Sequence, residues 1–120
     1  MDVEVRRIKA DDFEKLLSLY RFLNPEDPVL IVDDELRRHW NSILSDPHLY
    51  YLVVEENDIL VSSCALAIIK NLTRSARPYG LIENVVTHEN YRNKGYGTAV
   101  LKRAIEIAAA NNCYKVMLMT

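Results

Sequence analysis

Hydrophobic and polar positions in the first part of the chain follow the order strand, helix, helix. Val3–Lys9 alternates apolar and polar residues, which predicts a strand. Asp11 and Glu14 have the spacing of a capping box, so a helix is predicted to open there. A second helix, capped by one of the aspartates at 33–34, is predicted up to about Ser45, because apolar residues recur at helical spacing.

The remaining positions predict three strands in succession, then one helix and a last strand. A polar turn at 56–58 joins the first two of these strands as a hairpin, although it lacks glycine. The predicted strands are Leu49–Glu55, Ile59–Ile69, Leu81–Thr87 and Val116–Met119, and the predicted helix is Thr98–Asn111. This order predicts a single α/β domain over residues 1–120, in which helices flank a sheet with both antiparallel and parallel neighbours.

The final residue, Thr120, directly follows a predicted strand. A compact domain rarely ends on a newly formed central strand. We therefore expect a C-terminal part to be missing from this sequence or to be supplied by another chain. The exposed edge of such a strand invites pairing, so a homodimer is a further expectation.

Composition narrows the classes of protein. The net charge of -2 gives no support for nucleic-acid binding. No apolar run approaches the roughly 20 residues of a membrane span, and the acidic start of the chain lacks the apolar region of a secretory signal. Cys64 and Cys113 lie in apolar segments, which predicts buried thiols and no disulfide. A cytoplasmic protein without a metal site is expected.

Glycine is rare in this chain, and two of its three glycines, Gly95 and Gly97, stand one residue apart. They lie between a predicted strand and a predicted helix. Arg92 and Lys94 precede them as two cations, and Thr98 adds a hydroxyl at the helix start. Glycine lets the backbone approach an anion, and a helix N-terminus presents free N–H groups toward it. The segment therefore predicts binding of a phosphate-bearing ligand.

This segment has three other interpretations. The simplest is a tight turn that only leads into a helix. A dinucleotide-binding motif needs glycine or alanine at position 100, which is Val100 here. A P-loop needs lysine after the glycine, followed by serine or threonine, whereas Lys94 precedes Gly95.

The pattern Arg-x-x-Gly-x-Gly, formed by Arg92, Gly95 and Gly97 after the strand 81–87, resembles the signature motif of the GNAT superfamily of N-acetyltransferases. In that family the loop cradles the pyrophosphate of acetyl-CoA. The predicted element order also resembles the family's order along most of the chain. The resemblance implies a GNAT fold, here without the usual C-terminal helix and strands, and transfer of an acetyl group from acetyl-CoA to an amine.

Within the family, Ile82–Val86 and Asn112–Lys115 look most like the glucosamine-phosphate N-acetyltransferases. That subgroup has an Ile-Glu-Asp strand and a Cys-Tyr-Lys entry to the next strand. Asn84 stands where the subgroup has Asp, and this departure puts a sugar-phosphate acceptor in doubt.

The resemblance also assigns cosubstrate-binding positions. The backbone of the motif strand pairs with the pantetheine arm of acetyl-CoA, and the N–H groups of the loop hold the pyrophosphate. The matching positions are Val85, Val86 and Thr87 for the arm, and Arg92, Asn93, Lys94, Gly95, Tyr96, Gly97 and Thr98 for the pyrophosphate. The alternative for Arg92 and Lys94 is that they are simply solvated.

Acetyl transfer to an amine needs a group that helps to remove a proton, because an alkyl amine with a pKa near 10 is almost wholly protonated at pH 7. Glu83 is the candidate base, as a carboxylate expected to be half-buried on the motif strand with a raised pKa. Alternatively, Glu83 only binds the amine or pairs with Arg74 or Arg77. His88 is more typical of a loop histidine, and the general acid is expected beyond the sequence given.

Arg74 and Arg77, in the polar loop 70–79, would suit an acidic or phosphorylated amine, or they are solvated loop charges. The interpretation that we favour is an acetyl-CoA-dependent N-acetyltransferase of a small primary amine, acting by direct attack. Two alternatives remain. One is a non-catalytic or fragmentary CoA-binding module, and the other is an enzyme that acetylates a protein N-terminus or lysine.

Overall fold

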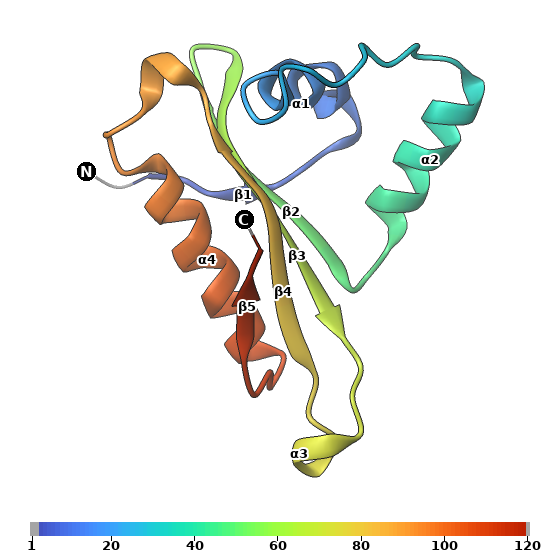
Figure 1. The fold of residues 1–120 in the computed structure, drawn as a ribbon, viewed down its shortest axis with the longest axis vertical. Helices are drawn as coiled ribbons and strands as arrows, with labels where there is room; N and C mark the ends of the chain where they lie inside the picture. Colours follow the sequence, from blue (N-terminus) through green and yellow to red (C-terminus); the bar gives the residue numbers. More distant parts are fainter. Residues whose placement is uncertain (1–2, 120) are drawn as a thin grey trace.

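The computed structural model describes residues 3–119, so the acidic start at residues 1–2 and the last residue lie outside the description. A single sheet carries helices on both faces (Figure 1). In chain order the elements are β1 (Arg6–Arg7), η1 (Ala10–Asp12), α1 (Phe13–Tyr20), α2 (Asp34–Ser45), β2 (Leu49–Glu56), β3 (Ile59–Ile69), α3 (Thr73–Ala76), β4 (Tyr79–Thr87), η2 (Glu89–Tyr91), α4 (Tyr96–Ala110) and β5 (Val116–Leu118).

The sheet has five strands in the order β1-β2-β3-β4-β5. The first four strands pair antiparallel in sequence, and β5 pairs parallel to β4 after the crossover through α4. This confirms the predicted mixed sheet. The hairpin between β2 and β3 turns at Asn57 and Asp58, both at positive φ (53° and 65°). These two residue types tolerate the left-handed region, which explains a tight hairpin without glycine.

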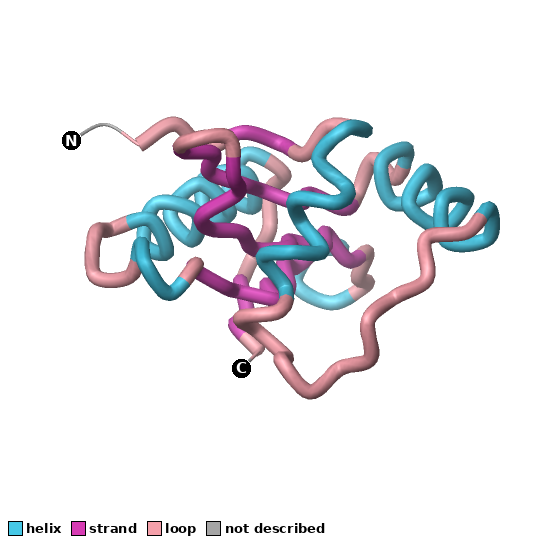
Figure 2. Tube along the Cα trace, turned by 90° about the horizontal axis from the view of Figure 1, so that it is seen from above, coloured by secondary structure: helices cyan, strands magenta, loops and turns pink. Residues whose placement is uncertain are grey.

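Each face of the sheet has its own hydrophobic core. On one face α4 packs its buried side chains, among them Val100, Ala104 and Ala108, against β2, β3 and β4. On the other face Phe13, Leu16 and Leu19 of α1 pack against Val53 of β2 and Val86 of β4, among other residues. A long loop joins α1 to α2 (Figure 2). The two faces are therefore available for two different tasks.

The start of the first helix differs from the capping box predicted at Asp11 and Glu14. A 3-10 turn, η1, precedes α1. The carboxylate that accepts hydrogen bonds at this corner is that of Asp12, which is only 3% exposed. Asp12 Oδ2 accepts from the Lys9 backbone N–H at 2.7 Å and from Arg6 Nη1 at 2.7 Å, and Oδ1 accepts from Arg6 Nη2 at 2.9 Å. This ion pair ties the end of β1 to the entry of α1.

The second helix is confirmed with the predicted bounds. Asp33 caps it by accepting from the Leu36 backbone N–H at 2.9 Å. Its buried Trp40 stacks on Phe13 with ring centroids 4.7 Å apart and donates through Nε1 to the Ala10 carbonyl at 3.1 Å. Trp40 therefore fixes α2 to the η1–α1 corner.

Several predicted boundaries of helices and strands were wrong, and so was the predicted burial of one cysteine. The first strand pairs only at Arg6–Arg7, because only these two residues align with β2. The polar loop contains the short α3, β4 begins at Tyr79, and α4 begins at Tyr96. Cys64 is buried as predicted, but Cys113 is only partly buried. Burial raises the pKa of the Cys64 thiol to about 12, so this thiol stays protonated near neutral pH.

We expect Asp12→Asn to lower the free energy of unfolding by about 1–3 kcal/mol at pH 7, because it removes the charge that the Arg6 guanidinium faces. Burial raises the pKa of Asp12, but the hydrogen bonds from Arg6 and Lys9 outweigh burial and hold that pKa below its ordinary value. A carboxylate with a depressed pKa stabilises the fold above its unfolded pKa of about 3.9, and this stabilisation is lost as the pH falls through the folded pKa.

Urea unfolding of wild type and Asp12→Asn at pH 7, 5 and 3 checks this expectation. The difference between the two proteins should be equal at pH 7 and 5 and smaller at pH 3. A difference that persists unchanged at pH 3 would contradict the role of the ion pair.

Candidate active site

The turn between β4 and α4 contains two residues with a left-handed backbone conformation, and one residue separates them. Asn93 has a φ of 63°, and Gly95, just before the helix, has a φ of 88°. A Cβ on Gly95 would meet no atom within 4 Å, so glycine is needed there for its backbone conformation. A Cβ on Gly97 would lie 3.4 Å from Thr87 Oγ1, about an ordinary contact distance, so the helix starts close to the end of β4 and alanine fits there.

The first turn of α4 is open to a ligand. Among the described residues no side chain caps this helix, and the first helical hydrogen bond runs from the Ala99 N–H to the Gly95 carbonyl. The N–H groups that precede Ala99 at the helix start therefore lack helical partners, and the helix dipole adds positive potential. They border a hollow of about 380 Å³ lined by Thr87, Tyr91, Arg92, Asn93, Gly95, Tyr96, Gly97 and Thr98. Such a hollow can hold an anion such as a phosphate.

Of the two cations of the loop, Arg92 lines this hollow and Lys94 does not. Arg92 donates through Nε to the Thr87 carbonyl at 3.2 Å. Lys94 Nζ lies 5.5 Å from the centroid of the Tyr91 ring, and the Tyr91 hydroxyl accepts from Asn57 Nδ2 at 3.0 Å. These contacts hold both cationic side chains close to the loop, where they add to the potential of the helix start.

β4 pairs with β5 along the first part of its length. The two strands pair from Gly80 with Val116 to Ile82 with Leu118, and the Met119 N–H donates to the Ile82 carbonyl at 2.9 Å. Beyond Ile82, β4 has no pairing with β5 in the part of the chain that the structure describes. Among residues 3–119, the β4 residues after Ile82 and up to Thr87 have no strand partner on this side, and they lead to the loop. An extended ligand can pair with such an edge.

A β-bulge lies at the point of separation. Glu83 pairs with Ala65 and Val86 with Ser63, so two residues of β4, Asn84 and Val85, oppose one residue of β3. Asn84 has a φ of 54°, in the left-handed region that short polar side chains tolerate. The bulge bends β4 and redirects its backbone N–H groups at this edge.

Glu83 is exposed, which corrects the expectation of a half-buried carboxylate. The pairing that the structure describes between β4 and β5 ends at Ile82, so no described residue of β5 covers Glu83. Glu83 and Tyr51 flank Ala65 of β3 from opposite sides, because both residues pair with Ala65. Burial raises the pKa of the Tyr51 hydroxyl, and the charge of Glu83 raises it further, which places the carboxylate within electrostatic reach of this tyrosine.

Arg74 and Arg77 are not brought together with Glu83 and the loop. They lie in and just after α3, at the end of β4 far from the start of α4 (Figure 1). Arg77 donates through Nε to the Asn112 carbonyl and through Nη2 to the Cys113 carbonyl, both at 3.2 Å, and so ties the turn between α4 and β5. The Arg74 guanidinium lies 5.6 Å from the Tyr114 ring centroid.

His88 packs in a way that agrees with its interpretation as a loop histidine. Its ring lies 4.4 Å from the Phe22 ring and 5.3 Å from the Tyr91 ring, between centroids. Its Nδ1 accepts from the Asn90 backbone N–H at 3.1 Å. His88 therefore joins the loop after α1 to the turn that leads into the hollow.

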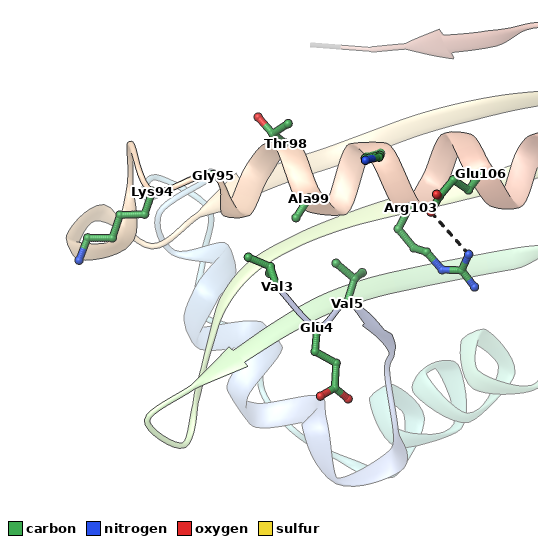
Figure 3. Close-up of a pocket in the computed structure, with 10 residues that line it drawn as sticks. Val3, Glu4, Val5, Lys94, Gly95, Thr98, Ala99, Arg103 and Glu106 are labelled. Atoms are coloured by element: carbon green, nitrogen blue, oxygen red, sulfur yellow. Dashed lines mark ion pairs between the residues drawn. The ribbon is translucent and has the colours of Figure 1, made fainter. Parts of the chain in front are cut away.

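Sequence reasoning missed a second hollow, of about 640 Å³, on the other side of the loop (Figure 3). Val3, Glu4 and Val5 form one wall, and the outer face of α4 forms the other. Gly95 and Thr98 border both hollows, so the helix start is accessible from two sides. The sequence pattern gave no indication of this hollow, because the segment before β1 was predicted to be a paired strand.

The chain belongs to the acetyltransferase (GNAT) family, whose family model matches residues 13–120. Members of this family use acetyl-CoA, and the chain is therefore an acetyl-CoA-dependent N-acetyltransferase by class. A glucosamine 6-phosphate N-acetyltransferase of Trypanosoma brucei brucei is 29% identical, with 98% of this chain aligned to 80% of that protein.

Solved structures agree with this assignment. A candidate acetyltransferase from Agrobacterium tumefaciens is 46% identical and superposes with a TM-score of 0.91, covering 98% of this chain and 81% of that chain. A predicted acetyltransferase from Clostridium acetobutylicum, solved with acetyl-CoA, is 26% identical with a TM-score of 0.78, covering 99% and 81%. The mixed sheet with flanking helices is therefore the GNAT fold.

Two kinds of feature are not found in residues 3–119. No helix in this range combines the length and the apolar character needed to cross a membrane. In the same range, His, Cys, Asp and Glu side chains do not gather in groups of three that could hold a metal ion.

We expect the two glycines to respond differently to alanine. Gly95→Ala should lower the free energy of unfolding by about 1 kcal/mol, because a side chain disfavours the left-handed φ at this position. Gly97→Ala should leave stability unchanged or raise it by up to about 1 kcal/mol, since alanine favours the helix. Urea unfolding of both variants measures this, and equal destabilisation by the two substitutions would contradict the separate roles.

Proposed function

We propose that the chain transfers the acetyl group of acetyl-CoA to a primary amine of a small molecule. The observation that carries the proposal is the edge of β4 beyond Ile82, which is unpaired among residues 3–119 and runs from the bulge to the N–H-lined hollow at the start of α4. One edge thus offers a place for an extended arm, and its end offers a place for phosphates.

The residues present fit acetyl-CoA. In the proposed complex the backbone of Val85, Val86 and Thr87 pairs with the pantetheine arm. The helix start and the loop, Arg92–Thr98, hold the pyrophosphate through N–H groups and cationic side chains. The missing side chain at Gly97 leaves the approach to Thr87 open. When bound, acetyl-CoA supplies an acetyl thioester as the group to be transferred.

The chain has three tasks in the proposed reaction. Glu83 accepts a proton from the amine, directly or through water, so that the nitrogen can attack the thioester carbonyl. A backbone N–H near Val86, redirected by the bulge, stabilises the negative charge that develops on the carbonyl oxygen. The C–S bond then breaks as the N–C bond forms, and CoA leaves as the thiolate. Water takes the remaining proton from the nitrogen and supplies the proton that the thiolate takes up. Positioning of the two reactants contributes about 7–11 kcal/mol, and a positioned base about 10²–10⁴-fold in rate.

An amino sugar is the first acceptor to test. The motif strand and the relative from Trypanosoma brucei brucei, a glucosamine 6-phosphate N-acetyltransferase by name, both point to this class. Asn84 and the position of Arg74 and Arg77, away from Glu83, give no support for a phosphate-binding role of these arginines within one chain. We therefore propose a small hydroxylated amine as the acceptor. The assay compares acceptors with and without a phosphate group.

The exposure of Glu83 favours one alternative, a CoA-binding module that does not catalyse transfer. Turnover with a panel of amines separates the two functions, and turnover of peptides instead of small amines would indicate a protein acetyltransferase. A homodimer and a cytoplasmic location stay predictions.

We expect acetyl-CoA to bind with a dissociation constant in the micromolar range, which corresponds to about -8 kcal/mol. Gly97→Glu should abolish this binding, because a carboxylate beside the helix start would occupy and repel the pyrophosphate site. Calorimetric titration measures both. Ser42→Glu, which adds the same charge to an exposed position of α2, should bind like wild type. Equal binding by Gly97→Glu would exclude the hollow as the phosphate site.

Glu83→Gln tests the base. If Glu83 removes the proton, kcat/KM for glucosamine should fall by about 10²–10⁴-fold at pH 7 while acetyl-CoA binding is unchanged. Glu89→Gln removes a nearby exposed carboxylate beyond the end of β4 and should leave the rate unchanged. A loss of less than about threefold in Glu83→Gln would assign Glu83 to another role.

A further inference from the structure

The loop between α1 and α2 exposes a continuous run of apolar side chains, Val29–Val32. Val29 is 78% exposed and Ile31 is 80% exposed. Soluble proteins commonly expose apolar residues singly, whereas a continuous exposed run marks a surface that contacts a partner. The loop extends away from the rest of the chain (Figure 2). Its first part is anchored, because Arg21 donates through Nη1 to the Asp27 carbonyl at 2.7 Å.

Acidic side chains flank this apolar run on both sides. Residues 22–36 contain no basic residue, although Arg21 and Arg37 lie just outside, and they contain five exposed acidic residues: Glu26, Asp27, Asp33, Asp34 and Glu35. None of these five forms an ion pair among residues 3–119. We call residues 26–35 the acidic loop. Such a surface is repelled by an anionic membrane, and it is complemented by a protein surface that is both basic and apolar.

The chain itself carries a basic surface of this kind around α3. Residues 69–80 and 107–119 contain no acidic residue and four basic ones: Lys70, Arg74, Arg77 and Lys115. The Arg74 guanidinium lies 5.6 Å from the centroid of the Tyr114 ring, and Lys115 Nζ lies 5.4 Å from the same centroid, so the two segments form one patch. Leu72, just before α3, is 91% exposed. We call residues 70–77 together with Lys115 the α3 tip.

The backbone of the α3 tip has an unusual conformation. Arg74, Ser75 and Ala76 have positive φ values of 54°, 60° and 60°. The left-handed region is unfavourable for residues other than glycine, so it persists only where surrounding contacts hold it. Here Asn71 Nδ2 donates to Thr73 Oγ1 at 2.9 Å and closes the entry to this turn. The tip is therefore organised before it meets a partner, which lowers the entropic cost of binding.

We propose that the α3 tip of one copy of this chain docks on the acidic loop of a second copy. Leu72 contacts the apolar run Val29–Val32, and Arg74 and Lys115 face the acidic residues beside it. The tip and the loop lie at opposite ends of the molecule, so one chain does not close this contact on itself (Figure 1). In a pair with two-fold symmetry the contact forms twice. It uses neither the edge of β5 nor the proposed acetyl-CoA site.

Charge reversal tests the contact by sedimentation velocity. Wild type should form a dimer with a dissociation constant on the order of micromolar. Arg74→Glu combined with Lys115→Glu places carboxylates of the tip against those of the loop, and Glu26→Lys combined with Glu35→Lys places cations of the loop against those of the tip. Each double variant alone should dimerise at least about tenfold more weakly, because like charges repel. An equimolar mixture of the two should recover a heterodimer, since the reversed residues of one chain then meet those of the other.

Matched controls separate this contact from a general effect of charge or apolar surface. Lys102→Glu reverses an exposed cation on α4 and should dimerise like wild type. Leu72→Ala should weaken the dimer about tenfold, whereas Ile105→Ala, which shortens an exposed apolar side chain of α4, should not. Circular dichroism spectra of all variants should match, because the substituted side chains are exposed.

Three results would overturn the inference. One is a wild type that stays monomeric at about 100 μM, well above the expected dissociation constant. The second is a pair of double variants that dimerise like wild type, which would place the interface elsewhere. The third is a mixture of the two double variants that stays monomeric, since a contact between tip and loop has to recover when both charges are exchanged.

Discussion

The bulge at Asn84 and Val85 is the constraint on which the site depends. In a regular strand Glu83, Val85 and Thr87 would share one face, because side chains alternate. The extra residue reverses this alternation: Glu83 and Val86 point to the α1 face, whereas Val85 packs with the core under α4. Thr87 can then meet Gly97 at the start of α4. One strand thus serves an amine on one face and a phosphate group on the other.

The bulge also affects the conformational free energy of the fold. A residue other than glycine in the left-handed region costs about 1–2 kcal/mol, and Asn84 reduces this cost because its short polar side chain is tolerated there. Aspartate, which the glucosamine-phosphate subgroup has at this position, is tolerated for the same reason. The backbone geometry is therefore compatible with either residue, and the departure at Asn84 changes the charge of the site while its shape is preserved.

The sequence was sufficient for those features that depend on local chemistry. Rare glycines beside cations identified the loop, an aspartate identified the start of α2, and apolar runs identified β2, β3 and β4. It was insufficient where pairing between distant strands decides the outcome. Glu83 was expected to be half-buried, but it is exposed among the described residues, where the pairing with β5 reaches only Ile82. Asp11 and Asp12 are equivalent by pattern, and only the position of Arg6 on β1 selects Asp12.

The division of the sheet into two faces explains how stability and function are distributed. On the α4 face the buried hydroxyl of Ser62 is satisfied, and the helix core holds the phosphate loop in place. On the α1 face the carboxylate of Glu83 is exposed. The packed α4 face therefore holds the proposed phosphate site, whereas the α1 face presents the group that is proposed to take a proton from the amine.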